Sequence, residues 1–72
     1  MDTLNRILNL LQERGIEQQE FANAIGLKKY VISEWKSGKT NSYLKYIDRI
    51  AEYFNVTADY LLGKTDKKSP PA

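Results

Sequence analysis

The stretch GLKKYVISEWKSGK, residues 26–39, combines a helical apolar pattern with a run of positive charge. Ile32 and Trp35 recur at helical spacing, which predicts a helix with one buried face. The same helix starts with Lys28 and Lys29, although a cation near a helix N-terminus opposes the helix dipole and costs roughly 0.3–1 kcal/mol. We therefore expect the positive charge at this point to serve binding rather than helix stability.

The positive charge of the chain is concentrated around this stretch. Residues 26–45 contain five lysines and one glutamate, a net charge of +4, whereas the whole chain of 72 residues carries +2. Residues 1–25 and residues 46–63 each carry −2. A basic segment between two acidic ones is compatible with an anionic partner such as nucleic acid, but charge alone does not distinguish this from its alternative. The alternative is a solvated helix face that binds nothing.

Length and composition limit the fold and the function. A chain of 72 residues can build one hydrophobic core and therefore one domain. It contains no cysteine and no histidine, which excludes disulfides, thiolate or imidazole metal sites and histidine-based catalysis. We expect no cofactor, no metal and no small-molecule ligand. No apolar run approaches the roughly 20 residues of a membrane span, and the start does not resemble a signal peptide, so we expect a cytoplasmic protein without membrane contact.

Upstream of this stretch, the sequence predicts two helices. The second runs from Gln18 to Ile25 and ends at Gly26, and its start is weakly capped because Glu17 stands where Ser, Thr, Asp or Asn is preferred. Asp2 or Thr3 is the expected N-cap of the first helix, which Gly15 ends. The apolar face of that first helix consists of Leu4, Ile7, Leu8 and Leu11.

Downstream, two more helices and a tail are expected. The pattern YLKYIDRIAEYF, residues 43–54, predicts a fourth helix, and Thr57 is the expected N-cap of a short fifth helix, ADYLL. Residues 64–72 mix charge with serine and two prolines and have no apolar period, which predicts a disordered tail or linker. The predicted architecture is an all-α fold of five short helices, residues 1–63, followed by this flexible tail.

Two helices joined by three or four residues at a large angle form a unit whose second helix can protrude. Such a joint needs a small residue where the helices approach and a turn that glycine permits, and Ala22 and Gly26 provide these. Val31 in part, with Ile32 and Trp35, is expected to pack inward. The outer face of the helix that begins at Lys28 and ends at Ser37 is then formed by Lys28, Lys29, Tyr30, Ser33 and Glu34.

The sequence ERGIEQQEFANAIGLKKYVISEWKSGK, followed by LKYIDRIAEYFNVTADYLLG, resembles the Cro/repressor-type helix-turn-helix family. These are the lambda-repressor-like (XRE family) DNA-binding domains of phage and bacterial regulators. The resemblance covers about residues 4–63 and depends on features that occur together in register: a glutamine that opens helix two, a glycine at the turn, Ile and Trp inside helix three and a final Asp-Tyr-Leu-Leu-Gly. It implies a five-helix fold in which helix three enters the major groove of double-stranded DNA.

The resemblance also implies roles for individual residues. Base contacts are implied for the outer face of helix three, namely Lys28, Lys29, Tyr30, Ser33 and Glu34. Contacts to the DNA backbone are implied for Gln18, Lys36, Lys39, Thr40, Asn41 and Tyr43. Because relatives commonly act as symmetric dimers, we expect a homodimer on a near-palindromic operator. The residues expected at the self-contact, from their position, are Tyr53, Val56, Tyr60 and Leu61.

Two departures from the family pattern involve charge. Glu17 stands where the family usually has a Thr or Ser cap, and its carboxylate would repel phosphates. Lys36 replaces a residue that is often acidic.

The sequence does not indicate that Glu17 and Glu20 form a catalytic pair of carboxylates. The helix dipole favours acidic residues in the first turn, and no apolar surroundings are indicated for these two. We therefore expect no enzyme activity.

The most concrete hypothesis is a sequence-specific DNA-binding transcriptional regulator, a phage or bacterial repressor that occupies its operator. One alternative is the antitoxin of a toxin–antitoxin pair, for which only the short tail is available to hold a toxin. An alternative of another class is a helical protein-interaction adaptor whose lysines serve solubility only.

Overall fold

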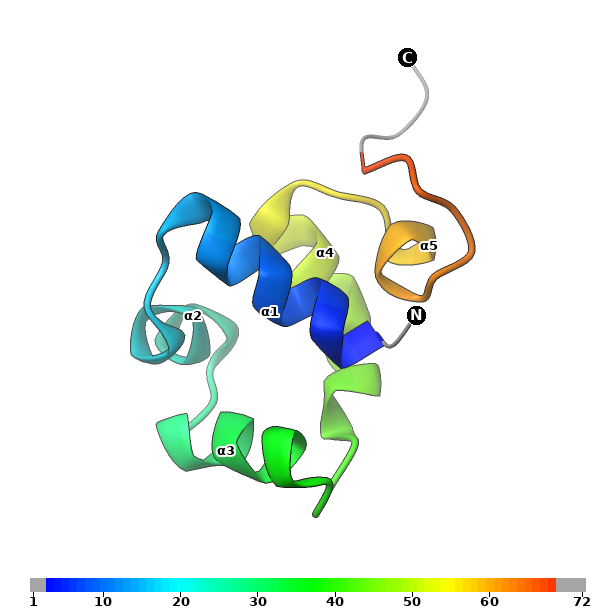
Figure 1. The fold of residues 1–72 in the computed structure, drawn as a ribbon. Coiled ribbons are helices and arrows are strands. Elements are labelled where there is room, and N and C mark those ends of the chain that lie inside the picture. Colours follow the sequence, from blue (N-terminus) through cyan, green and yellow to red (C-terminus); the bar gives the residue numbers. More distant parts are fainter. Residues whose placement is uncertain (1–2, 69–72) are drawn as a thin grey trace.

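The apolar periods of the sequence form helices in the computed structural model, which describes residues 3–68 (Figure 1). These residues contain no strand, which confirms the all-α prediction. None of their helices is both long enough and apolar enough to cross a membrane. The elements are α1 (Thr3–Arg14), α2 (Gln18–Ile25), α3 (Lys29–Ser37), a 3₁₀ turn η1 (Ser42–Leu44), α4 (Ile47–Phe54) and α5 (Ala58–Leu61).

Aromatic side chains form the centre of the core. Phe21 of α2 and Phe54 of α4 stack with their ring centroids 5.4 Å apart, and Tyr53 packs against both rings. Trp35 brings α3 to the same core, and α3 itself lies at one edge of the molecule (Figure 1). The other buried apolar residues are Leu4, Ile7, Leu10, Leu11, Ala22, Ile25, Ile32, Ile50, Ala51, Val56 and Leu61.

The buried side of α1 differs from the predicted one. Leu4, Ile7 and Leu11 are buried as expected, but Leu10 is also buried and Leu8 is only half-buried. The reason is that α5 and the segment after it pack on α1, so that the buried face turns toward Leu10 and away from Leu8. The sequence period of α1 alone could not show which neighbour would cover it.

Several helix ends follow the predicted caps, but Thr3, one of the two expected N-caps of α1, is instead the first residue of that helix. Gly15 follows α1 with a positive φ of 65°. The Tyr60 N–H donates to Thr57 Oγ1 at 3.0 Å, which confirms the N-cap of α5. Glu17 precedes α2 without a side-chain cap hydrogen bond, in agreement with the weak cap predicted there. Asp2, one of the two expected N-caps of α1, lies outside the described residues.

The prediction of one continuous helix over residues 43–54 is wrong. The chain forms η1 and a turn before α4 begins, and the Tyr46 N–H donates to the Tyr43 oxygen at 3.2 Å, the spacing of a 3₁₀ turn. This tighter turn places the Tyr43 ring edge-on against Trp35, with ring centroids 5.6 Å apart, and leaves Leu44 45% exposed. A tertiary contact therefore overrides the local helical period.

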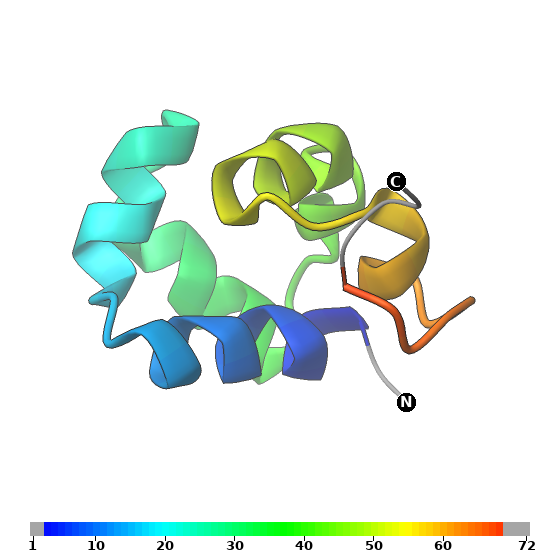
Figure 2. The ribbon, with the colours of Figure 1, turned by 90° about the horizontal axis from the view of Figure 1, so that it is seen from above.

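Arg6 is a buried charged residue that the sequence pattern did not single out. It is only 6% exposed, and its guanidinium donates to the carbonyl oxygens of Tyr60 and Thr65, each at 2.9 Å. The guanidinium also donates to Asp66 Oδ1 at 2.9 Å and lies 4.6 Å from the centroid of the Tyr60 ring. These contacts hold residues 64–68 beside α5, at the end of the molecule away from α2 (Figure 2).

The segment 64–72 was expected to be a tail, yet its described part makes specific contacts. Besides the bonds from α1 described above, Lys68 Nζ lies 3.0 Å from Glu13 Oε1. Residues 64–68 are therefore tied to the helical domain, because their polar groups find partners on α1. The rest of the segment lies outside the described residues, and the division of the chain at residue 63 stays a prediction.

Replacing Arg6 with alanine is expected to lower the free energy of unfolding by about 2–4 kcal/mol, because three acceptors lose a charged donor. Arg14→Ala is the control, since Arg14 is exposed and lies only over the Phe54 ring, 5.4 Å from its centroid. That change is expected to cost less than about 1 kcal/mol. Urea unfolding followed by circular dichroism measures both variants. Equal losses would contradict the role given to Arg6.

Candidate nucleic-acid interface

A glycine turn joins α2 to α3. Gly26 has a left-handed φ of 89°, and its N–H donates to the Ala22 oxygen at 3.0 Å. The Leu27 N–H donates to the same oxygen at 2.7 Å, and Lys28 is extended and precedes α3. A side chain at position 26 would be strained at this φ. The prediction of two helices joined by three or four residues is confirmed, and the joint consists of residues 26–28.

One side of α3 is anchored in the core. Ile32 is fully buried, and Trp35 is 2% exposed. The Trp35 Nε1–H donates to Ser42 Oγ at 2.7 Å, so the buried indole nitrogen has a partner in η1. Val31 is half-buried at the edge of this side. The interpretation of Trp35 as a core residue is therefore confirmed. The hydrogen bond of Trp35 to Ser42 also holds the chain that follows α3 in place.

The opposite side of α3 is exposed. Tyr30 is 62% exposed, and Lys29, Ser33 and Lys36 are exposed as well. Helical spacing places Tyr30 and Ser33 in the middle of this side, with the two lysines toward α2. Lys28, the N-cap of α3, is also exposed. These side chains can meet a partner that lies along α3.

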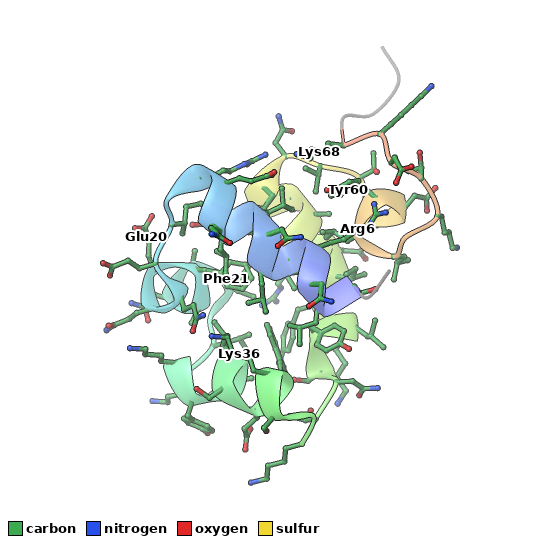
Figure 3. All side chains as sticks on the ribbon, viewed as in Figure 1. Arg6, Glu20, Phe21, Lys36, Tyr60 and Lys68 are labelled. Carbon is green, nitrogen blue, oxygen red and sulfur yellow. The ribbon has the colours of Figure 1, made fainter. Side chains whose placement is uncertain are left out.

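A surface hollow lies where α1, α2 and α3 come together. Gln18, the first residue of α2, and Lys36 of α3 both line it, and Figure 3 shows Lys36 on the part of α3 toward α1 and α2. An adjoining hollow is lined by Glu17, Gln18 and Lys29. The structure therefore brings Gln18 close to two lysines of α3. It also places the exposed Glu17 carboxylate in the same region, where it reduces the local positive charge.

The turn after α3 borders the other edge of the helix. Gly38 is left-handed, with a φ of 82°, and the Lys39 N–H donates to the Glu34 oxygen at 3.0 Å. Lys39 Nζ lies 3.2 Å from Glu34 Oε2, so the two side chains form an ion pair. A hollow between α3 and the turn is lined in part by Tyr30, Glu34, Lys39 and Thr40.

Some side chains of the turn after α3 make contacts within the protein and are therefore less available to a partner. Thr40 Oγ1 accepts the Ser42 N–H at 3.1 Å, and the half-buried Tyr43 packs its ring on Trp35. Asn41 is exposed. Ser42 was not predicted as a residue of this region, because its partner Trp35 lies in another element and no periodic pattern connects the two. Among the residues of this turn, Lys39 and Asn41 are exposed and therefore the most accessible to an external partner.

The residues expected at a self-contact are placed very differently. Leu61 is fully buried and Val56 is 7% exposed, so both belong to the core and offer almost no surface to a second copy. Tyr53 and Tyr60 are half-buried and have some surface. Of the four expected residues, only these two tyrosines can serve as contacts on the folded domain, and a role in self-contact stays a prediction.

Acidic side chains do not form a metal site in residues 3–68, where no group of three potential ligands lies close enough to hold an ion. Glu17 and Glu20 are both exposed at the start of α2. The helix dipole favours acidic residues at that position, which accounts for them without a catalytic role.

A family model for a helix-turn-helix domain matches residues 5–67. The chain therefore belongs to the helix-turn-helix domain family, of the XRE/Cro-like type. Membership in this family indicates DNA binding, and its domains are typically non-enzymatic. A search of curated proteins and a search of solved structures gave no match.

Replacing Ser42 with alanine is expected to lower the free energy of unfolding by about 1–3 kcal/mol, because the buried Trp35 N–H loses its acceptor. Ser37→Ala is the matched control, because the Ser37 hydroxyl donates to the Glu34 oxygen at 3.0 Å in an exposed position. The control is expected to stay within about 0.5 kcal/mol of the wild type. Thermal and urea unfolding measure both changes. A Ser42 variant as stable as the Ser37 variant would show that the indole bond stabilises nothing.

Proposed function

We propose that this protein is a sequence-specific transcriptional regulator that binds double-stranded DNA, and more specifically a phage or bacterial repressor. It occupies an operator in the cytoplasm and so blocks polymerase or a competing regulator, and it performs no chemistry. The observation that carries this proposal is the exposed side of α3, which lysines border on both long edges.

The positions of these lysines match the shape of DNA. Lys29 and Lys36 lie toward α2, whereas Lys39 lies toward the turn on the other edge. The major groove of B-form DNA is about 12 Å wide and admits one α-helix, and a phosphate backbone runs along each side of it. A helix in that groove therefore meets phosphates at both edges, where lysines gain most from the negative charge.

Within this arrangement, the middle of the exposed side of α3 contacts the bases. Ser33 donates or accepts at a base edge, and Lys29, although it starts from the edge toward α2, has a side chain long enough to reach guanine O6 and N7. The Tyr30 ring packs on a thymine methyl, or its hydroxyl reaches a phosphate. Lys28, the N-cap of α3, contributes a further base contact at the start of the helix. The residues that contact the DNA backbone are Gln18, Lys36, Lys39, Asn41 and, with the part of their side chains that remains exposed, Thr40 and Tyr43.

We also propose that two copies bind together. One small module buries too little DNA surface for strong discrimination, so specificity requires two half-sites. The operator is then near-palindromic, with half-sites about one helical turn, roughly 34 Å, apart. Tyr53 and Tyr60 are the candidate residues for contact between the copies.

The discriminating experiment is a gel shift with random-sequence duplex DNA at about 50 mM and 200 mM salt. A DNA-binding regulator loses affinity steeply as the salt concentration rises, because phosphate contacts release counterions. A protein-interaction adaptor whose lysines serve solubility shows no salt-dependent binding, and that result would overturn the proposal. The antitoxin alternative has only the short tail, residues 64–72, to hold a toxin, and residues 64–68 of it contact Arg6 and Glu13 of α1.

Replacing Lys39 with alanine is expected to weaken the binding of all duplexes by nearly the same factor and to lower the salt slope by about one unit. The reason is the loss of one phosphate contact that carries no sequence information. Lys68→Ala is the matched control, because Lys68 also pairs with a glutamate but lies at the end of the molecule opposite to α3 (Figure 3). An unchanged slope for the Lys39 variant would remove this residue from the interface.

Tyr30→Ala and Ser33→Ala are expected to leave the fold intact, since both side chains are exposed. Each change should alter the preference at one or two base pairs, by about 1–3 kcal/mol at its own position, with little effect on non-specific binding. Competition binding with a cognate duplex, its single-base variants and a scrambled duplex measures these effects. If both variants weaken cognate and scrambled DNA by the same factor, these residues contact only the backbone.

A further inference from the structure

We propose that Glu34 competes with DNA phosphates for Lys39 and thereby weakens the binding of every duplex. This proposal rests on the function proposed above and gives Glu34 a task other than base contact. Glu34 is a positioning residue in this account, because it acts on DNA through the lysine that it holds.

Lys39 contacts Glu34 through a backbone hydrogen bond and a side-chain ion pair. Its backbone N–H donates to the Glu34 carbonyl oxygen at 3.0 Å, and its Nζ lies 3.2 Å from Glu34 Oε2. The first bond is a consequence of the left-handed Gly38, which folds the chain back over the last turn of α3. The local backbone therefore delivers the Lys39 side chain to the Glu34 carboxylate.

The Glu34 carboxylate is unusual because it lies in a segment that is otherwise basic. Glu34 is the single acidic residue in the basic segment 26–45, which also contains five lysines. It lies on α3 at the edge that borders the turn, in a hollow lined also by Thr40 and Ser42. A partner with negative charge that reaches this edge meets both the Lys39 ammonium and the carboxylate that neutralises it.

The exposure of the two side chains makes the exchange possible. The Lys39 side chain is 75% exposed and that of Glu34 is 27% exposed, so the lysine can leave while the carboxylate stays against the protein. Ion pairs with an exposed partner are weak, and breaking this one lowers DNA affinity by only about two- to fivefold. Such a penalty is small enough for phosphate to overcome and large enough to measure.

The same geometry argues against base contact by Glu34. The middle of the exposed side of α3 is occupied by Tyr30, which is 62% exposed, and by Ser33. Glu34 is half-buried at the edge and already has a charged partner. A carboxylate that reads cytosine must reach the exposed amino group of that base in the groove. The position of Glu34 suits the control of a neighbouring lysine better.

The chain offers a matched pair of variants for the test. Glu34→Gln and Glu13→Gln each remove the carboxylate of one Glu–Lys pair at the surface, with N–O distances of 3.2 Å and 3.0 Å, and each raises the net charge of +2 by one unit. Glu13 pairs with Lys68, which lies far from α3 (Figure 3). Any effect of net charge alone is therefore common to both variants. The measurement is affinity for random-sequence duplex DNA, made with and without the additional change Lys39→Ala.

We expect E34Q to bind random duplex about two- to fivefold more tightly than E13Q, and we expect this gain to disappear when Lys39 is alanine. With binding by the wild type intact, equal affinities of E34Q and E13Q would overturn this proposal alone. A gain that persists without Lys39 would also overturn it, since Glu34 would then repel phosphates directly. No salt-dependent binding by the wild type would overturn the proposed function and this proposal with it.

Discussion

The hydrogen bond from Trp35 Nε1 to Ser42 Oγ, at 2.7 Å, connects the burial of α3 to the position of the turn that follows it. Because the indole is buried, its N–H must find an acceptor inside the protein, and Ser42 provides one. This bond ties η1 to α3 next to the Tyr43 ring, which packs on the tryptophan, while the left-handed Gly38 sets the position of Lys39 at the edge of α3. One side of the helix is thereby held firmly, and the other side is left to solvent or to a partner.

Local signals were enough to predict the two helices on either side of Gly26. Their bounds were right to within one residue, because glycines in the left-handed region end both helices. The outer face of α3 also followed from the helical period. The break before α4 and the burial of Arg6 could not be predicted in this way. Both depend on partners in other elements, namely Trp35 for Tyr43 and residues 60–66 for Arg6.

The same distinction applies to the candidate interface. Its four lysines are evident from the sequence, since they belong to the five that fall within residues 26–45. How they are divided between the two edges of α3 depends on the turn geometry at Gly26 and Gly38 and on the packing of α2. The pairing of Lys39 with Glu34 likewise appears only when the left-handed turn has folded the chain back. The roles of individual residues on DNA remain predictions that the variants above address.

Selection of bound duplexes from a random pool tests most directly whether α3 reads DNA sequence. The protein is incubated with the pool, and the retained duplexes are amplified and sequenced over several rounds. We expect the pool to converge on one near-palindromic site whose half-sites are about one helical turn apart. A retained pool that remains random in sequence would contradict it, because binding through phosphates alone selects nothing.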